Sequence, residues 1–183
     1  MASIDIIEEV RRHIGFKPIP KIDPNTQAPE PGKSQTPDLG NAVIPALLVG
    51  FYKHTRNESQ SADLLNLKDT DNILTVLFGD KRNRIIESVS NYSGVSEADG
   101  ETEMKNTVSS IIEVLRKEIK DINAKGVTTF FTEQRSNILK HLPVELNMGE
   151  LMDDSSVDDR TNKMEGPMSG MMHTIEKIFS TTK

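Results

Sequence analysis

The segment that decides the fold is Asn72-Ile-Leu-Thr-Val-Leu-Phe-Gly-Asp-Lys-Arg-Asn-Arg-Ile-Ile-Glu-Ser-Val-Ser-Asn-Tyr-Ser-Gly-Val-Ser96. It predicts two short apolar helices that end at Gly79 and Gly94, because glycine readily adopts the left-handed conformation that follows many helices. We expect Asp80 to cap the second of these helices. Ser96, followed three residues later by Asp99, resembles a capping box and predicts the start of a third helix.

The third helix carries the clearest helical pattern in the chain. Its apolar residues recur on one face over about five turns, at Met104, Val108, Ile111, Ile112, Leu115, Ile119 and Ile122. We expect this long amphipathic helix to form the centre of the core and Gly126 to end it. Thr128 or Thr129 is the predicted cap of a following helix, whose inward side chains are Phe131, Ile138 and Leu142. A short helix over 145–152 is predicted to come next.

Two helices are predicted before this region. Asp38 or Asn41 begins one of them, with an apolar stripe at i, i+3, i+4 and i+7 that consists of Ile44, Leu47, Leu48 and Phe51. The other is an N-terminal helix capped by Ser3 and stopped by Gly15. Residues 16–37 lie between them and hold six of the nine prolines, which predicts an extended linker. We therefore expect the N-terminal helix to pack loosely or to dock on another molecule.

No segment shows the alternating pattern of a strand. The predicted fold is thus all-α, a compact bundle of short helices around one long amphipathic helix. We divide the chain into an N-terminal helix at 1–15, a proline-rich linker at 16–37, a helical core domain at 38–152, and an acidic loop with a Met-rich helix at 153–183. Apolar residues make up only 35% of the 183 residues, which indicates that part of the chain lies outside the core.

Composition narrows the possible functions. The formal net charge of −6 disfavours nucleic acid, which usually meets a basic stripe. The absence of cysteine excludes disulfides, thiolate metal sites and cysteine nucleophiles. Aromatic residues are only 4% and tryptophan is absent, which disfavours base stacking. The N-terminus does not resemble a secretory signal and no apolar run is long enough to span a bilayer, so we expect a cytoplasmic protein.

The candidates for catalysis or metal binding are few. The four histidines, His13, His54, His141 and His173, fall on separate predicted segments, and each is expected at the surface or at its rim. His141, with Glu145 and Glu150, is the alternative enzyme or metal site. The acidic residues after Glu150 fail the calcium-loop pattern and indicate a solvated, mobile loop. We predict no catalytic residue, no metal site and no cofactor.

Two groups of residues are candidates for binding a partner. Lys81, Arg82 and Arg84 form a small basic cluster, which could meet phosphate or an acidic partner or, as an alternative, weakly bind nucleic acid. The C-terminal segment is amphipathic and adaptable in shape because of its methionines. Its apolar face, which packs on the parent core or on a partner, consists of Met168, Met171, Met172, Ile175, Ile178 and Phe179.

Residues 38–148 resemble a bacterial family of unknown function, the YidB-like domain proteins. The match rests on Ile73–Gly79, on the helix 85–92 with the step Ser93-Gly-Val-Ser96, and on the stripe of 108–122. Residues 126–143 resemble a further family segment that runs to Leu-Pro, although Thr-Phe-Phe stands where aliphatic residues are usual. The resemblance implies an all-helical fold and a bacterial source, and no catalytic residues.

These features together predict a non-enzymatic interaction or scaffold protein. Its apolar grooves or its terminal helices would bind a protein partner or a second copy of the chain. The two rival predictions are an enzyme or metal protein that uses His141, Glu145 and Glu150, and a nucleic-acid binder that uses Lys81, Arg82 and Arg84.

Overall fold

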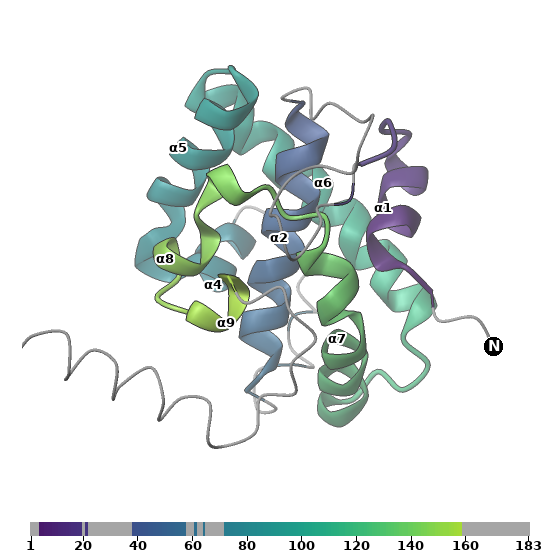
Figure 1. Cartoon of the computed structure of the whole chain (residues 1–183). Coiled ribbons are helices and arrows are strands. Elements are labelled where there is room, and N and C mark those ends of the chain that lie inside the picture. Colours follow the sequence, from purple (N-terminus) through teal and green to yellow (C-terminus); the bar gives the residue numbers. More distant parts are fainter. Residues whose placement is uncertain are drawn as a thin grey trace, which may run out of the picture.

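The computed structural model describes residues 4–19, 21, 38–57, 61, 64 and 72–158. Within these residues every regular element is a helix, so the predicted all-α bundle is confirmed (Figure 1). The elements are α1 (Ile6–Ile14), α2 (Leu39–Thr55), α4 (Ile73–Phe78), the 3-10 turn η1 (Gly79–Lys81), α5 (Arg82–Ser93), α6 (Glu97–Glu118), α7 (Ala124–Leu139), the 3-10 turn η2 (Val144–Leu146), α8 (Met148–Leu151) and α9 (Ser155–Asp158). None of the described helices is long and apolar enough to cross a membrane.

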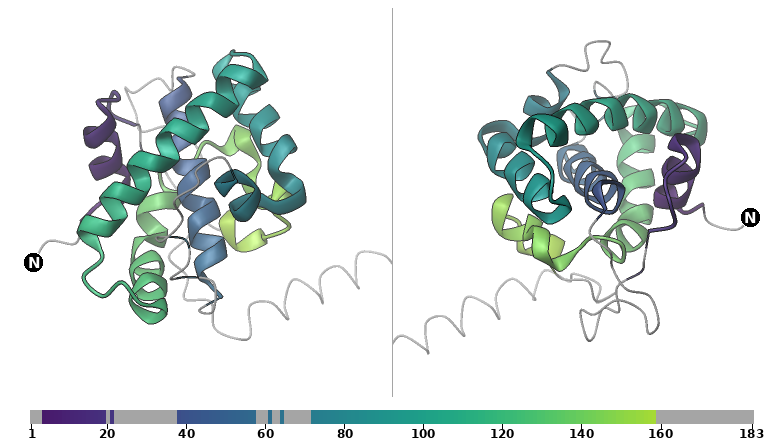
Figure 2. Two further views of the ribbon diagram at one scale, coloured as in Figure 1. Left: turned by 180° about the vertical axis from the view of Figure 1, so that it is seen from behind. Right: turned by 90° about the horizontal axis from the view of Figure 1, so that it is seen from above.

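Helix α2 occupies the centre of the bundle. Seen from above, it lies inside a ring formed by the other helices (Figure 2), and it contacts α1, α4, α5, α6 and α7. Every residue from Gly40 to Tyr52 is buried, because the segment is apolar on all sides and not along one stripe. Helix α6, the longest of the described helices, was expected at this position but packs on one side of α2. Asp38 caps α2 by accepting a hydrogen bond from the Gly40 N–H at 2.9 Å.

The segment 72–96 folds as two helices and the start of a third. Gly79 has φ 56° and ψ −131°, which is not the expected left-handed conformation, and the chain continues through η1 directly into α5. No side chain caps α5, so the prediction that Asp80 does so is wrong. Gly94 adopts the left-handed conformation and ends α5, and the hydroxyl of Ser96 caps α6, both as predicted.

Helix α6 ends earlier than the sequence pattern suggests. Its last residue is Glu118, and Ile122 lies beyond it with 48% of its surface exposed. The predictions that Gly126 stops α6 and that a threonine caps α7 are both wrong. Asn123 caps α7 by accepting a hydrogen bond from the Gly126 N–H at 2.9 Å, and a Cβ at position 126 would overlap the Asp121 carbonyl oxygen. Glycine is therefore required by this close approach.

Helix α1 is part of the core, which corrects the prediction of loose packing. Ile6, Ile7 and Val10 are fully buried, and the helix contacts α2, α6 and α7. Asp5 caps it, whereas Ser3, the predicted cap, lies outside the described residues. Of the predicted linker, residues 16–19 and 21 are described, and Ile19 is buried against the core.

The chain after α7 forms short turns. The predicted helix over 145–152 is divided by Asn147, a non-glycine residue with φ 49°. Part of the predicted mobile loop forms α9, whose Val157 is fully buried. The predicted Met-rich helix with Met168, Met171, Met172, Ile175 and Phe179 lies outside the described residues.

Candidate functional site

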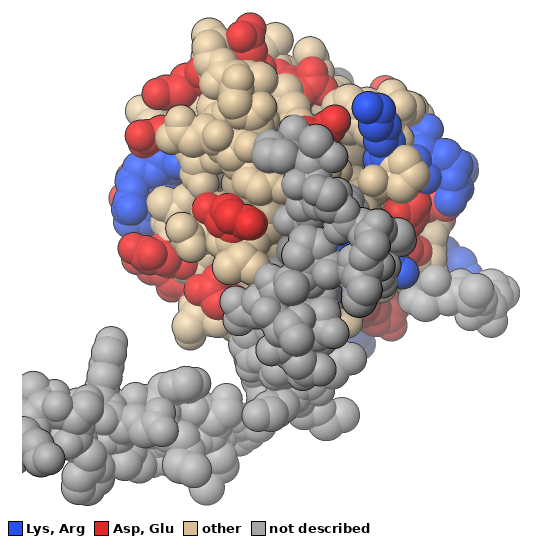
Figure 3. Space-filling view, turned by 45° about the horizontal axis from the view of Figure 1, so that its top comes forward, with Lys and Arg blue, Asp and Glu red and all other residues tan. Residues whose placement is uncertain are grey.

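The predicted basic cluster is separated by the fold. Lys81 lies 3.0 Å from Asp153 and 3.6 Å from Asp80, and Arg82 forms an ion pair with Glu101 of α6. Only Arg84 has no ion pair within the described part of the chain. Acidic and basic side chains are interspersed on the face shown in Figure 3. A continuous basic surface, which nucleic-acid binding requires, is therefore not formed by these three residues.

Arg84 instead lines a hollow of about 450 Å³ between α5 and residues 145–151, here called the α5 hollow. One wall is a stripe of α5 residues with helical spacing, Arg84, Glu87, Ser88, Asn91 and Tyr92. The other wall is Glu145, Leu146, Asn147, Glu150 and Leu151. The two walls are joined where the Ser88 hydroxyl donates to the Leu146 carbonyl at 3.0 Å.

The α5 hollow contains charges that nothing in the described chain neutralises. Arg84, Glu87, Glu145 and Glu150 are all exposed, and none of them forms an ion pair with a described residue. Three carboxylates and one guanidinium give the hollow a local charge of −2 (1 − 3). The structure thus brings Arg84 together with Glu145 and Glu150, two of the three residues predicted for the rival enzyme site.

Tyr92 has an unusual environment at this site. Its hydroxyl oxygen is buried without a hydrogen-bond partner in the described structure. Burial raises the pKa of the Tyr92 phenol, and the negative charges of Glu145 and Asp38 raise it further, because each disfavours the phenolate. The phenol consequently remains neutral and keeps its O–H donor throughout the physiological pH range.

His141 is not part of the α5 hollow. Its side chain is fully buried, with Nε2 3.9 Å from Asp5 Oδ2, so the expectation of a surface or rim histidine is wrong. The residues that line the α5 hollow include Glu145 and Glu150 but not His141. In the described ranges no group of three His, Asp or Glu residues could hold a metal ion. An enzyme or metal site that uses His141, Glu145 and Glu150 stays a prediction, and His141 does not line the hollow that the two glutamates share.

Asp5 and α7 form an anchor for α1 that the sequence did not indicate. Lys140 lies 2.8 Å from Asp5. The buried Gln134 amide accepts from the Ile6 N–H at 3.1 Å and donates to the Ile4 carbonyl at 2.8 Å. These partners are more than 120 residues apart in sequence, so no local pattern could have paired them.

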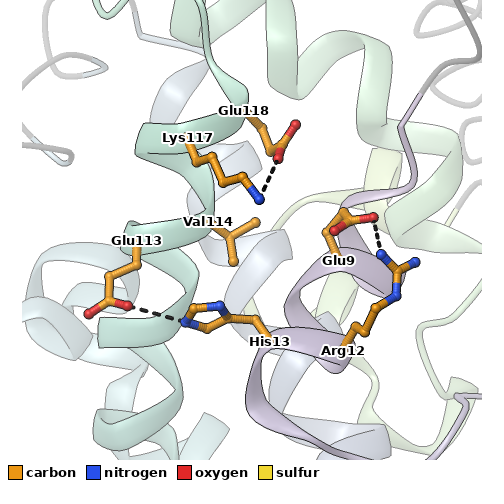
Figure 4. Close-up of a pocket in the computed structure, with 7 residues that line it drawn as sticks. All are labelled: Glu9, Arg12, His13, Glu113, Val114, Lys117 and Glu118. Atoms are coloured by element: carbon orange, nitrogen blue, oxygen red, sulfur yellow. Dashed lines mark hydrogen bonds and ion pairs between the residues drawn. The ribbon is translucent and has the colours of Figure 1, made fainter.

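A second hollow, of about 300 Å³, lies between α1 and α6 (Figure 4). His13 of α1 points across it to Glu113 of α6, at 3.2 Å. Arg12 pairs with Glu9 along α1 at 2.6 Å. The charged side chains of this second hollow pair with one another, which makes the hollow a weaker binding candidate than the α5 hollow.

Comparison of the chain with protein-family models, with curated proteins and with solved structures finds no match. The resemblance to YidB-like domain proteins therefore stays a prediction.

Proposed function

We propose that this chain is a non-enzymatic interaction protein that binds a protein partner at the α5 hollow. The observation that carries the proposal is the convergence on one hollow, between α5 and residues 145–151, of four exposed charged side chains that form no ion pair with a described residue. Unpaired charges cost little in water, and complementary charges on a partner steer its approach and fix its orientation. The resemblance to a bacterial, YidB-like family and the predicted cytoplasmic setting belong to the same proposal.

The local charge of −2 favours a partner segment that carries lysine or arginine. Arg84, at the edge of the same hollow, would pair with an acid beside that segment and so set its direction. The exposed Asn91 and Asn147 side-chain amides add neutral groups that can donate to a bound main chain.

The test compares Glu145→Gln and Glu150→Gln with the matched control Glu133→Gln, an exposed glutamate on α7. Proteins captured from cell extract by each variant are quantified and located on the chain by cross-linking. We expect the two hollow variants, and not the control, to lose the partner whose cross-links fall on α5 and residues 145–151. Equal capture by all three variants would refute the proposal.

The predicted roles of a second copy and of the C-terminal segment need separate measurements. Molar mass in solution, measured over a range of protein concentrations, reports self-association directly. Deletion of residues 167–183 removes none of the residues that line the α5 hollow. If that deletion removes the partner and the two Glu→Gln variants do not, the Met-rich segment is the binding element and our assignment of the α5 hollow is wrong.

A further inference from the structure

A third hollow, of about 380 Å³, combines an apolar floor with two lysines. It lies between the end of α2, the corner of α4 and η1, and residues 152–153, and is here called the Lys81 hollow. Leu77, Phe78 and Met152 are buried and form its floor. Its polar residues are Lys53, His54, Asp80, Lys81 and Asp153.

Two carboxylates of this hollow, Asp80 and Asp153, lie near Lys81, and Asp80 is the more distant at 3.6 Å. Lys81 Nζ lies 3.0 Å from Asp153 Oδ2, and the Lys53 ammonium donates to the adjacent Met152 carbonyl. The hydrogen bond and charge of Lys81 hold the pKa of Asp153 below its ordinary value, and the charges of Lys53 and Arg84 lower it further. An anion at the Asp153 carboxylate position is thus favoured by three cations from α2, η1 and α5.

Asp153 itself holds this position weakly. Its side chain is 75% exposed, and an exposed ion pair shifts an equilibrium by no more than about fivefold. Its backbone lies in the left-handed region at φ 53°, which Asp and Asn adopt more readily than other residues with a side chain. A ligand that supplies a stronger anion would therefore displace the Asp153 carboxylate from Lys81.

We propose that the Lys81 hollow binds a phosphate monoester with an apolar or aromatic group, and that Asp153 competes with this phosphate for Lys81. A phosphate monoester carries close to two negative charges and three strong acceptor oxygens, and lysine binds phosphate as a point charge. The apolar part of the ester would lie on Leu77, Phe78 and Met152. The Lys81 hollow and the α5 hollow share no lining residue, although Arg84, which lines the α5 hollow, also contributes to the positive charge at Asp153.

The ring of His54 provides a local reporter of binding. Burial lowers the pKa of His54, while a hydrogen bond with the Val76 backbone opposes that shift. A phosphate beside the imidazole favours the protonated form. We therefore expect phenyl phosphate to raise the pKa of His54, as followed by NMR of its ring protons.

The test titrates phenyl phosphate into the full chain and three variants by calorimetry. Asp153→Asn removes the competing charge and keeps a side chain that tolerates the left-handed region, so we expect about fivefold tighter binding. Lys81→Met should weaken binding by about tenfold or more, as expected for the loss of a hydrogen bond to a charged group. Lys117→Met, on the exposed face of α6, is the matched control and should bind like the wild type.

Equal affinity of the wild type and Lys81→Met, or no gain in Asp153→Asn, would overturn the proposal. The His54 titration uses the wild-type protein and therefore does not depend on whether a variant folds. If phenyl phosphate does not raise the pKa of His54 in the wild type, the proposal is also overturned.

Inorganic phosphate should bind more weakly than phenyl phosphate if the apolar floor takes part, and equal affinity contradicts that role. A phosphotyrosine peptide titrated in parallel shows whether the phosphate monoester belongs to a protein or to a small molecule. Tighter binding of the peptide indicates a phosphorylated protein, and equal binding indicates a small phosphate ester.

Discussion

Gln134 shows how one buried amide can fix the position of a distant helix. It is 2% exposed, and both ends of its amide group bind main-chain atoms of residues 4 and 6. The amide therefore acts at the start of α1 as a cap supplied from another helix, because the first N–H groups of a helix have no partner within it. Asn137 supports the arrangement by donating to Gln134 Oε1 at 3.0 Å.

We expect Gln134→Leu to lower the free energy of unfolding by about 1–3 kcal/mol, because it leaves the buried Ile6 N–H without its partner. The Ile4 carbonyl would still accept from Asn137 at 3.3 Å. Urea denaturation measures this loss. Glu133→Gln, at the neighbouring exposed position, should change stability by less than about 0.5 kcal/mol. A loss of similar size in both variants would contradict the role given to the amide.

The Tyr92 phenol gives a second prediction for a single residue. In a Tyr52→Phe background, which removes the other tyrosine, the absorbance of the phenolate should titrate above the ordinary value of 10.0. Glu145→Gln should lower the pKa of Tyr92 by removing a nearby negative charge, and Glu133→Gln should leave it unchanged. If the pKa of Tyr92 does not change in Glu145→Gln, the charge of Glu145 does not act on the Tyr92 hydroxyl.

Helices α5 and α6 cross closely because one of them has a glycine at the crossing. A Cβ at Gly100 would overlap the hydroxyl of Ser90 and would lie 3.3 Å from its Cβ. The Ser90 hydroxyl is buried and has no hydrogen-bond partner in the described structure. The crossing therefore depends on small size at both positions and not on a hydrogen bond.

We expect Gly100→Ala to cost about 1–3 kcal/mol, the usual range for overpacking. Ser90→Ala should be close to neutral, and it should recover much of the loss in the double variant because the overlapping oxygen is gone. Denaturant unfolding of the four proteins gives the coupling energy. Additive effects would show that the two residues do not meet.

Asp154, in the segment with α8 and α9, should make the stability of the fold depend on pH. Burial acts to raise the pKa of Asp154, but hydrogen bonds from Ser156 and the charge and hydrogen bond of Arg56 outweigh burial, so the pKa lies below 3.8. A lowered folded-state pKa stabilises the fold above the unfolded-state value, and this contribution disappears as the pH falls through the folded-state pKa. Wild type should therefore be more stable than Asp154→Asn at neutral pH and lose that advantage below about pH 3.8. A constant difference at every pH would be inconsistent with this assignment.

Helix starts and ends could be predicted from the sequence where the capping interaction lies within the sequence pattern itself. Gly94 and Ser96 were predicted correctly because their roles are set by neighbours within three or four residues. Gly126 was misread as a helix end because its requirement comes from the Asp121 carbonyl, five residues earlier, in the turn between α6 and α7, and the apolar pattern does not reveal this turn. The α5 hollow was missed because Arg84 and Glu145 are brought to one hollow only by tertiary packing.

At the scale of the whole molecule, α1 belongs to the same core as the helices that follow the proline-rich segment. The buried residues before residue 38 and Val157 after residue 152 belong to one hydrophobic cluster with α2. The sequence indicated the apolar face of α1 correctly. It could not indicate the surface that this face covers, because α1 and α7 are separated by more than 100 residues.

We expect deletion of residues 1–15 to destabilise the protein strongly, because it uncovers the surface beneath Ile6, Ile7 and Val10. Each of these side chains contributes about 1.5–3 kcal/mol on burial, before the entropy of ordering α1 is subtracted. The midpoint of urea denaturation should fall well below that of the full chain. An unchanged midpoint would mean that α1 does not pack on its own chain in solution.

The burial of α2 on all sides also determines how its amide hydrogens reach water. Surface helices release their amides by local fraying, whereas a helix enclosed by five others cannot open without separating them. The amides of residues 44 and 46–51 should therefore exchange with deuterium most slowly, at a rate that reports global unfolding. Exchange in α8 and α9, which are four residues each, should be faster by orders of magnitude.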